Sequence, residues 1–449
     1  MRTLPSGRTR LPPTTRAVVR LLVVLLAVGV WIATTTPHRS QPQPPTTASR
    51  QAPAPTSVGA RAAAARARPA VRQPSAAAET RPAPATSAGR VAAPAESRPR
   101  AEPSRRVATP RPRPPTGFTL MASGDVLAHG SVVARAGAYG GRSGRRFDFR
   151  PMFASVRPLV SAADLAVCHL ETPLSPSGRR LSGYPRFNAP PQLAAAIHHA
   201  GYDACSVASN HAMDQGVRGV AGTLAVLDRA GLRHAGTARS PREARPRILT
   251  VHRVRVALLS YTYGLNGFRL PPGRPWLVNL LGPGRVLADA RAARRAGSQF
   301  TVVFLHWGQE YRSAPTPAQR RLARRLLADP SVDLLVGHHA HVVQPIERSH
   351  GKWVAFGLGN SLSAQSAACC PAATQDGVLL QATIVAKAGR MVVARLRYVP
   401  TWVEHPSYRI LPVARALARG SASPATRAML RASLHRTTAA VGHATRPAT

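Results

Sequence analysis

From residue 117 onward the chain alternates short apolar, β-branched runs with segments of helical periodicity. Strands alternating with helices of about ten to fifteen residues are typical of an α/β domain. In open sheets of this class, ligands bind at the carboxyl ends of the strands. The strands are predicted at 118–122, 163–170, 204–208, 254–261, 300–305, 332–337, 353–356 and 378–385, and the helices at 152–162, 190–200, 216–230, 287–296 and 317–328.

Five of these strands end in a side chain that can bind a metal ion. Considered alone, each residue has a structural explanation, as a turn residue, a helix cap or a satisfied core histidine. Their recurrence at successive strand ends favours a shared metal site over separate structural roles. The predicted metal ligands are Asp125, Glu171, Asn210, His306, His339 and His341.

The densest signal is the Gly-His-His-Ala-His segment at 337–341, which follows an apolar run. On an extended backbone, His339 and His341 would project from one face of the strand and His338 from the other. Imidazole is the commonest side-chain metal ligand. The alternative is an exposed histidine cluster in a loop, but the other strand ends favour the metal site.

A mixed set of carboxylate, amide and imidazole ligands suits zinc, manganese or iron better than calcium or magnesium alone. Two such ions would activate a bridging water and hold the oxygens of a phosphoryl group. His211 follows Asn210 directly and is predicted to protonate the leaving group. Asp214 is predicted to fix the tautomer of His211 if a helix starts there. The expected cofactors are therefore two divalent metal ions.

Six motifs occur in a fixed order: Gly124-Asp125-Val-Leu, His-Leu-Glu-Thr-Pro-Leu at 169–174, Ser-Asn-His-Ala-Met-Asp at 209–214, His306-Trp-Gly-Gln-Glu-Tyr, Gly-His-His-Ala-His at 337–341 and Gly-Leu-Gly-Asn at 357–360. Together they resemble the CapA family, which includes the PgsA-type poly-γ-glutamate proteins. The resemblance covers about 117–413 and implies a calcineurin-like metallophosphatase fold, an α/β sandwich flanked by helices. It also implies the six metal ligands above, His211 as the acid, and a role in capsule or poly-γ-glutamate synthesis, transport or anchoring.

The chain departs from that family at several positions. His169 stands where the family usually has asparagine, and Ser-Asn-His at 209–211 replaces Asn-Asn-His. The Asp-x-His motif of many metallophosphatases is absent, while His129 follows Asp125 by four residues. The roles of His129, His169 and His338 stay open, and with them full occupancy by two ions and catalysis.

The N-terminus has the residue order of a secretory signal or a signal anchor. Arginines between residues 2 and 20 precede an apolar run at 21–33. Counted from residue 17, the run reaches the short end of a membrane span, and no clear cleavage site follows it. We therefore predict a cytoplasmic basic segment and a retained anchor at 1–34, with the folded domain outside the cytoplasm. The alternative is a protein secreted after cleavage.

Residues 35–116 are rich in proline, alanine and arginine and contain few large apolar side chains. Such a composition cannot bury enough apolar surface to offset its chain entropy, so it predicts a disordered spacer. The folded domain is expected at 117–413. A basic tail rich in alanine and arginine, partly helical, is expected at 414–449.

The formal net charge of the chain is +43. Basic proteins attract nucleic acid, anionic membranes and acidic polymers. No zinc finger, helix-turn-helix or RNA-binding motif accompanies the charge, so nucleic acid is not the expected partner. With an export signal present, we expect an anionic envelope polymer or its phosphorylated precursor, and other capsule-synthesis membrane proteins. The alternative function is a noncatalytic scaffold that tethers the polymer through its basic surface.

The four cysteines do not have the spacing of a zinc site. Cys168 and Cys205 lie in apolar, strand-like runs, and we interpret them as small core residues rather than as disulfide partners. Cys369 and Cys370 are adjacent in a loop, where an oxidising compartment would permit a disulfide. The sequence leaves the pairing open.

Overall fold

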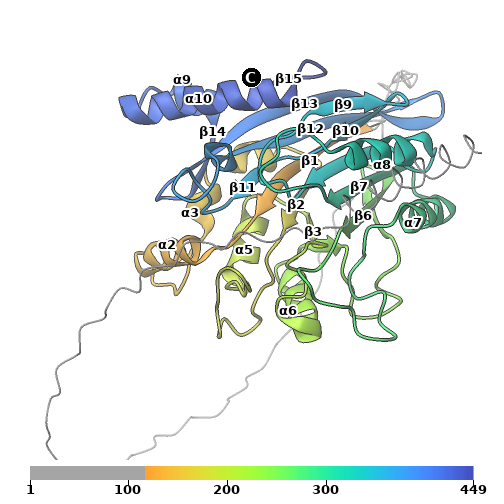
Figure 1. Ribbon diagram of the computed structural model, residues 1–449, viewed down its shortest axis with the longest axis horizontal. Coiled ribbons are helices and arrows are strands. Elements are labelled where there is room, and N and C mark those ends of the chain that lie inside the picture. Colours follow the sequence, from red (N-terminus) through yellow and green to blue (C-terminus); the bar gives the residue numbers. More distant parts are fainter. Residues whose placement is uncertain (1–116, 448–449) are drawn as a thin grey trace, which may run out of the picture. The chain divides into compact units, whose positions relative to one another are not determined.

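The computed structural model describes residues 117–447, so the anchor predicted at 1–34 and the spacer predicted at 35–116 lie outside the described residues. The described residues form two β-sheets with helices on their outer faces (Figure 1). The inner faces of the two sheets share one apolar cluster, which includes Leu120, Val167, Val302, Val336 and Leu380. The predicted α/β sandwich flanked by helices is confirmed.

The first sheet combines a parallel half with an antiparallel half. Its parallel half contains β1 (Gly117–Val126), β2 (Leu165–Leu170), β3 (Ala204–Ser206) and β4 (Arg233–Ala235), and its antiparallel half contains β12 (Asp376–Lys387), β13 (Arg390–Glu404) and β14 (Arg409–Pro412). The strand order is β14-β13-β12-β1-β2-β3-β4. Two short strands join it at the side: β11 (Asn360–Leu362) pairs with β1, and β15 (Arg446–Pro447) pairs with β13.

The second sheet has the order β5-β6-β7-β8-β10-β9. Strands β6, β7, β8 and β10 are parallel, and the outer strands β5 and β9 are antiparallel to their neighbours. Carboxyl ends of parallel strands therefore occur in both sheets. The bounds are β5 (Arg247–Val251), β6 (Val254–Thr262), β7 (Phe300–His306), β8 (Leu334–His338), β9 (Ile346–Ser349) and β10 (Lys352–Ala355).

The central strands are buried on both faces, which explains why they are apolar without alternation. On β7, Val302 and Phe304 face the other sheet, while Val303 and Leu305 contact the helices outside.

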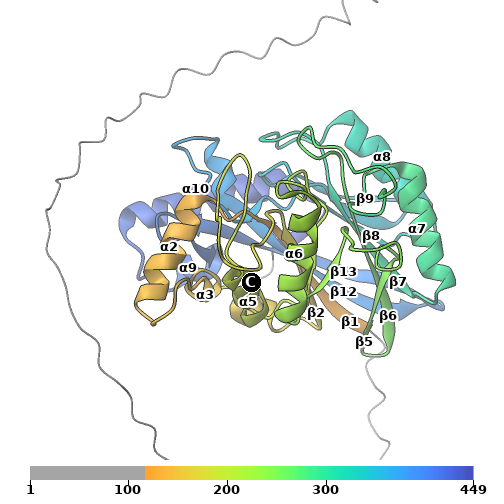
Figure 2. The ribbon, with the colours of Figure 1, turned by 90° about the horizontal axis from the view of Figure 1, so that it is seen from below.

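The helices α2, α3, α5 and α6 cover the first sheet and α7 and α8 cover the second (Figure 2). The helix bounds are α2 (Gly130–Gly141), α3 (Arg150–Phe153), α4 (Arg157–Val160), α5 (Gln192–His199), α6 (Gly216–Arg229), α7 (Pro283–Arg295), α8 (Pro317–Ala328), α9 (Val413–Ala418) and α10 (Pro424–Val441).

The helix predictions were correct where the sequence has clear end signals. Helix α8 starts at Pro317, and the Thr316 side chain accepts a hydrogen bond from the Gln319 backbone N–H in a capping box. The single helix predicted at 152–162 is wrong, because the segment forms two one-turn helices, α3 and α4. Pro158 lies in the first turn of α4, where proline starts a helix readily and cannot continue one.

The segment after residue 413 packs on the first sheet. Helix α10 lies across β12 and β13 (Figure 1), and the Arg436 guanidinium donates two hydrogen bonds, of 2.7 and 2.9 Å, to the Asp376 carboxylate on β12. Leu430 packs with Trp402 and Val413 in a small cluster. Among residues 117–447, no helix is both long and apolar enough to cross a bilayer.

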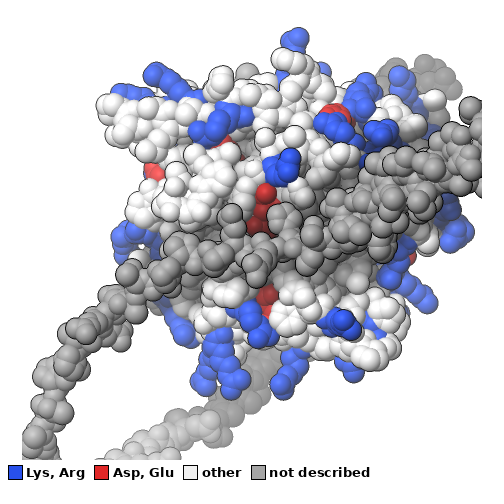
Figure 3. Space-filling view, in the orientation of Figure 1, with Lys and Arg blue, Asp and Glu red and all other residues white. Residues whose placement is uncertain are grey.

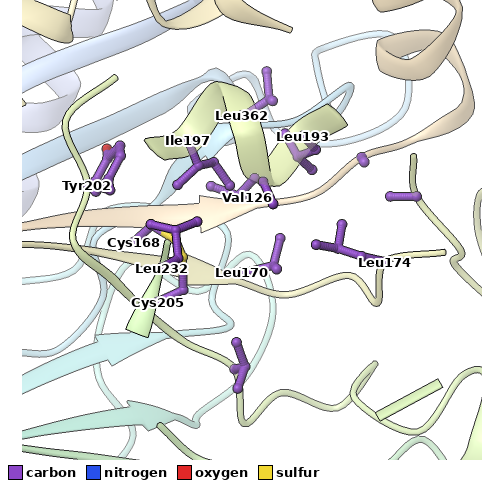
Figure 4. Close-up of a cluster of buried hydrophobic side chains, with 14 of the residues drawn as sticks. Val126, Cys168, Leu170, Leu174, Leu193, Ile197, Tyr202, Cys205, Leu232 and Leu362 are labelled. Carbon is purple, nitrogen blue, oxygen red and sulfur yellow. A yellow bond between two sulfur atoms is a disulfide. The ribbon is translucent and has the colours of Figure 1, made fainter. Parts of the chain in front are cut away.

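A disulfide joins β2 to β3 through Cys168 and Cys205, so our interpretation of these two cysteines as unpaired core residues is wrong. The two residues are direct neighbours in the sheet, with Cα atoms 4.5 Å apart, a spacing that sequence alone cannot show. The bridge lies inside the apolar cluster with Leu170, Ile197 and Leu232 (Figure 4). Cys369 and Cys370 are both free thiols.

The bridge closes a loop of sequence separation 37, so its loss should destabilise the domain. We expect the Cys168→Ala/Cys205→Ala double variant to lose about 2–4 kcal/mol of unfolding free energy, because the unfolded chain regains conformational freedom. Denaturant titration of the double variant and of a Cys369→Ala/Cys370→Ala control would measure this. An equal loss in the two variants would contradict the prediction.

Candidate metal centre

The carboxyl ends of strands from both sheets meet in one buried cluster. Asp125 lies near the end of β1, Glu171 directly follows β2, and Asn210 follows β3 after a short turn. From the second sheet, β7 ends at His306 and β8 ends at His338. All six predicted ligands are buried. The structure therefore brings together, at the predicted edge, side chains that the sequence separates by up to about two hundred residues.

Asp125 is held by three donors. The Nδ1 atoms of His338 and His341 lie 2.8 and 3.2 Å from its carboxylate oxygens, and the His339 backbone N–H donates at 3.0 Å. Burial alone would raise the pKa of Asp125, but the hydrogen bonds from His338 and His341 hold it well below its usual value. The group is therefore a fixed negative charge at the base of the cluster.

Glu171 has the opposite environment. Both of its carboxylate oxygens are buried without a hydrogen-bond partner among the described residues. The Nε2 atoms of His306 and His341 lie 3.7 and 3.8 Å from Oε1, beyond hydrogen-bond distance. Burial raises the pKa of Glu171 well above its usual value. A buried carboxylate with two free oxygens requires an explanation, and a bound cation would supply one.

His306 and Asn210 face each other across the cluster. The His306 Nε2 atom lies 2.9 Å from Asn210 Oδ1, and the Asn210 amide donates to Asn266 Oδ1 at 3.2 Å. That donation fixes the Asn210 oxygen on the side of His306. Burial lowers the pKa of His306 well below its usual value, so the ring is neutral and suited to metal binding.

His339 and His341 reach the cluster by a route that differs from the prediction. Strand β8 ends at His338, and the next residues turn: φ is 89° at His339 and 55° at His341. The premise of an extended backbone with both rings on one strand face is therefore wrong. The turn nevertheless brings ring nitrogens of both histidines within 4.8 Å of a Glu171 carboxylate oxygen. The expectation that His338 points away is also wrong, because His338 contacts Asp125.

The His211 ring lies beside the cluster and is oriented by Asp214. Its Nδ1 atom is 2.8 Å from Asp214 Oδ2, which also accepts from the Phe187 backbone N–H at 2.7 Å. The two residues lie in a turn before α6 rather than in a helix. The predicted contact between His211 and Asp214 therefore forms, but in a turn conformation instead of the helical one. The Phe187 ring packs edge-on against His211 at 4.8 Å. The Asn266 amide nitrogen lies 3.4 Å from both ring nitrogens of His211, so Nε2 has one long polar contact.

Two further histidines and an asparagine lie around the predicted ligands. His169 lies inside the cluster, whereas His129 accepts a backbone hydrogen bond from Ala364 and packs on Phe187. Asn360, on β11, was not predicted as a site residue, and its Oδ1 lies 3.2 Å from His341 Nδ1. The Gly-Leu-Gly-Asn motif at 357–360 ends in Asn360 and could have indicated its place in the site. Asn360 pairs with Asp125, because β11 lies next to β1.

The residues fit divalent metal ions. Glu171 belongs to two groups whose ligand atoms all lie within 4.8 Å of one another, one with His169 and His306 and one with His339 and His341. Besides the free Glu171 oxygens, the Nδ1 atom of His339 is buried without a partner among the described residues. Mixed carboxylate and imidazole donors suit manganese, iron or zinc. The shared carboxylate fits a site for two ions.

Metal binding should release protons at neutral pH. Burial opposes the charge on His341, but Glu171 and Asp125 outweigh it and raise its pKa to about 9, so the metal-free ring is protonated at pH 7. Because a metal competes with the proton that His341 and Glu171 share, affinity should rise as the pH increases toward 9. Titration calorimetry in two buffers of different ionisation enthalpy should give about one released proton. Heats independent of the buffer would contradict this.

Comparison with known proteins supports the resemblance seen in the motifs. Residues 119–365 match the family described as bacterial capsule synthesis protein PGA_cap. The chain is 28% identical over 214 residues to the PGA biosynthesis protein CapA of Bacillus subtilis, covering 46% of this chain and 56% of that protein. It is 26% identical over 218 residues to the capsule biosynthesis protein CapA of Bacillus anthracis, covering 46% and 53%. The chain thus spans about half the length of these relatives.

Similar solved structures include two bacterial proteins of low sequence identity. One is the NAD nucleotidase NadN of Haemophilus influenzae, with a TM-score of 0.38 and 11% identity over 73% of this chain and 57% of that chain. The other is the calcineurin-like phosphoesterase YfkN of Bacillus subtilis, with a TM-score of 0.38 and 11% identity over 72% and 100%. The family match at 119–365 covers more than half of the sequence, and the chain therefore belongs to the bacterial capsule synthesis protein PGA_cap family.

Proposed function

We propose that the protein is a metal-dependent phosphoesterase that takes part in the synthesis of an anionic envelope polymer of the capsule or poly-γ-glutamate type and acts on a phosphorylated precursor or carrier of that polymer. The observation that carries this proposal is Glu171, a buried carboxylate without hydrogen-bond partners in the described residues, grouped with four imidazoles. A site built only for stability would satisfy or remove such a group. The proposed ligands of two divalent ions are Asp125, Glu171, Asn210, His306, His339 and His341.

When bound, the two ions would activate a water molecule and polarise the phosphoryl oxygens. The residues of the chain supply the remaining steps. His211 is placed beside the ligands, with Nδ1 held by Asp214 at 2.8 Å, and it gives a proton from Nε2 to the leaving oxygen. The Phe187 ring and its backbone N–H keep the pair in place.

We further propose that the domain is held outside the cytoplasm by a retained N-terminal anchor. The arginine-then-apolar order of residues 2–33 supports an anchor of this orientation. The Cys168–Cys205 disulfide supports an oxidising, extracytoplasmic compartment. Other membrane proteins of capsule synthesis are the proposed neighbours. Protease accessibility in spheroplasts tests the location, and a mature chain that starts after residue 33 would show cleavage instead.

A noncatalytic scaffold is the second candidate. Its support is the charge: the chain has 61 lysines and arginines against 18 acidic residues. On the face shown in Figure 3 the basic side chains are spread over the surface, and only a few acidic ones are visible. A scaffold would bind an anionic polymer through this surface in a salt-dependent way, with the metal only stabilising the fold.

One experiment separates the two candidates. The full-length protein is purified from membranes, loaded with manganese, and assayed for bound metal and for hydrolysis of phosphomonoesters and phosphodiesters. We expect two ions per chain and metal-dependent turnover that chelation removes. Absence of turnover, together with salt-sensitive binding of poly-γ-glutamate that persists in EDTA, would instead favour the scaffold.

A further inference from the structure

Two buried histidines form a stacked pair within the ligand cluster. The rings of His169 and His338 lie 4.0 Å apart with an interplanar angle of 15°. They come from neighbouring layers of the sandwich, His169 from β2 in the first sheet and His338 from the end of β8 in the second. Both side chains are almost completely buried. The contact therefore joins the two sheets directly at the metal centre.

Each ring of this pair contacts a different predicted ligand. The His338 Nδ1–H donates to Asp125 Oδ1 at 2.8 Å. The His169 Nε2 atom lies 3.0 Å from Nδ1 of His306. His338, from the second sheet, thus orients the Asp125 carboxylate of the first sheet. His169, from the first sheet, orients the His306 imidazole of the second sheet.

The hydrogen bonds around His169 allow the tautomer that a metal-binding His306 needs. The Ser206 hydroxyl donates to the Cys168 carbonyl oxygen at 3.3 Å and can accept from His169 Nδ1–H at 2.8 Å. His169 Nε2 can then accept from His306 Nδ1–H at 3.0 Å, which leaves the lone pair of His306 on Nε2 for a metal ion. Without an ion, the 2.9 Å contact between His306 Nε2 and Asn210 Oδ1 is a hydrogen bond from Nε2–H, because the amide oxygen only accepts. The same Nε2 atom lies 3.7 Å from Glu171 Oε1.

The stacked pair does not have the arrangement of a third metal site, although Asp125, His169 and His338 lie close enough together to suggest one. Stacked rings hold their nitrogens side by side instead of converging on one point. Both nitrogens of His169 and the Nδ1 of His338 already have partners. The remaining nitrogen, His338 Nε2, is buried without a partner in the described residues, beside the Phe304 ring.

We infer that His169 and His338 are positioning residues for a two-ion site: His169, with Ser206 behind it, presents Nε2 of His306, and His338 presents the Asp125 carboxylate. The inference rests on the proposed function in that it requires the site to bind metal. Groups that orient a ligand in this way typically contribute about 10–100-fold to metal affinity.

The test measures manganese binding by the full-length protein and four variants. His169→Phe keeps the ring and the stack on His338 but loses both hydrogen bonds, so its affinity should fall about 10–100-fold, with two ions still bound at saturation. His169→Asn, which keeps an amide acceptor, should recover part of this loss. His338→Phe should weaken binding in the same way. Ser206→Ala, farther from the ions, should give a smaller loss of affinity. This variant replaces His169→Phe in the test if His169→Phe does not fold.

The shift of the thermal midpoint between EDTA and manganese distinguishes positioning from a merely structural role. Positioning predicts that the metal-induced shift of the midpoint is smaller in His169→Phe than in the wild type, beyond the fall of the EDTA midpoint that the two lost buried hydrogen bonds cause. Three ions in the wild type with one lost in His169→Phe, or an unchanged affinity in this variant, would overturn the inference. Two ions without hydrolysis would refute only the proposed catalysis. A wild type that binds no metal would refute both.

Discussion

The Glu171→Gln variant is expected to bind no more than one divalent ion, while its metal-free form stays as stable as the wild type. Glu171 is shared by the two ligand groups around His306 and around His339 and His341. Glutamine keeps the volume but removes the charge that would neutralise two cations. We expect the affinity for the second ion to fall by more than about 100-fold. Loss of a residue that only orients a ligand already lowers metal affinity about 10–100-fold, and loss of the ligand itself should lower it further.

Metal-free stability should not decrease, because burial favours the neutral form of Glu171 and glutamine is close to that form in shape and charge. At an ion concentration 100 times the dissociation constant, each bound ion stabilises the fold by about 2.7 kcal/mol. The wild type should therefore gain two such increments, and the variant one at most. Calorimetric unfolding with manganese and with EDTA measures both quantities.

A matched control is Glu347→Gln, on β9, which loses its ion pair with Arg320 outside the metal centre. Surface ion pairs contribute little, so this variant should show the wild-type response to metal. If Glu171→Gln also gains the full metal-induced stabilisation, Glu171 is not a shared ligand. If Glu171→Gln unfolds in EDTA, the Glu171 carboxylate stabilises the metal-free fold, although it forms no hydrogen bond with the described residues.

Much of the fold could be predicted because the buried parallel strands are nearly continuous apolar runs. The strands β6, β7 and β12 and the helices α6 and α8 were recognised by composition and end signals. Strand β13 was not predicted: its segment 392–397 is mostly exposed or only partly buried, and residues 394–397 alternate apolar residues with arginine. Helix α2 was also missed, because its glycines and the arginines after it indicated a loop.

The site could be predicted as a set of residues but not as a geometry. Polar side chains at strand ends converge because parallel strands share an edge, which requires no knowledge of the turns. The positions of His338 and His339 depend on a positive φ just beyond β8, and a strand pattern assigned them to the wrong faces. His169 was visible only as a departure from the family pattern. Its contact with His306 joins two sheets, and no local signal predicts it.

The second large effect is expected on turnover, when His211, the proposed proton donor, is replaced. His211→Ala should lower turnover of alkyl phosphate esters by about 10²–10⁴-fold, the usual contribution of a positioned proton donor, while two ions remain bound. Among residues 117–447, His211 forms no hydrogen bond with Asp125 or Glu171, and it reaches Asn210 only through the long contact with Asn266, so the ligands should keep their places. Steady-state kinetics and metal content measured on the same preparation test the two parts of this prediction.

The leaving group separates an acid from a group that merely binds substrate. A nitrophenolate ion leaves without a proton, so His211→Ala should retain most of its activity on a nitrophenyl ester and lose it on an alkyl ester. His199→Ala, an exposed histidine on α5, should change neither rate. Asp214→Asn should follow the same pattern more weakly, because the 2.8 Å contact with Nδ1 orients the ring without touching substrate. Equal losses on both esters would refute the acid role and leave His211 as a binding group.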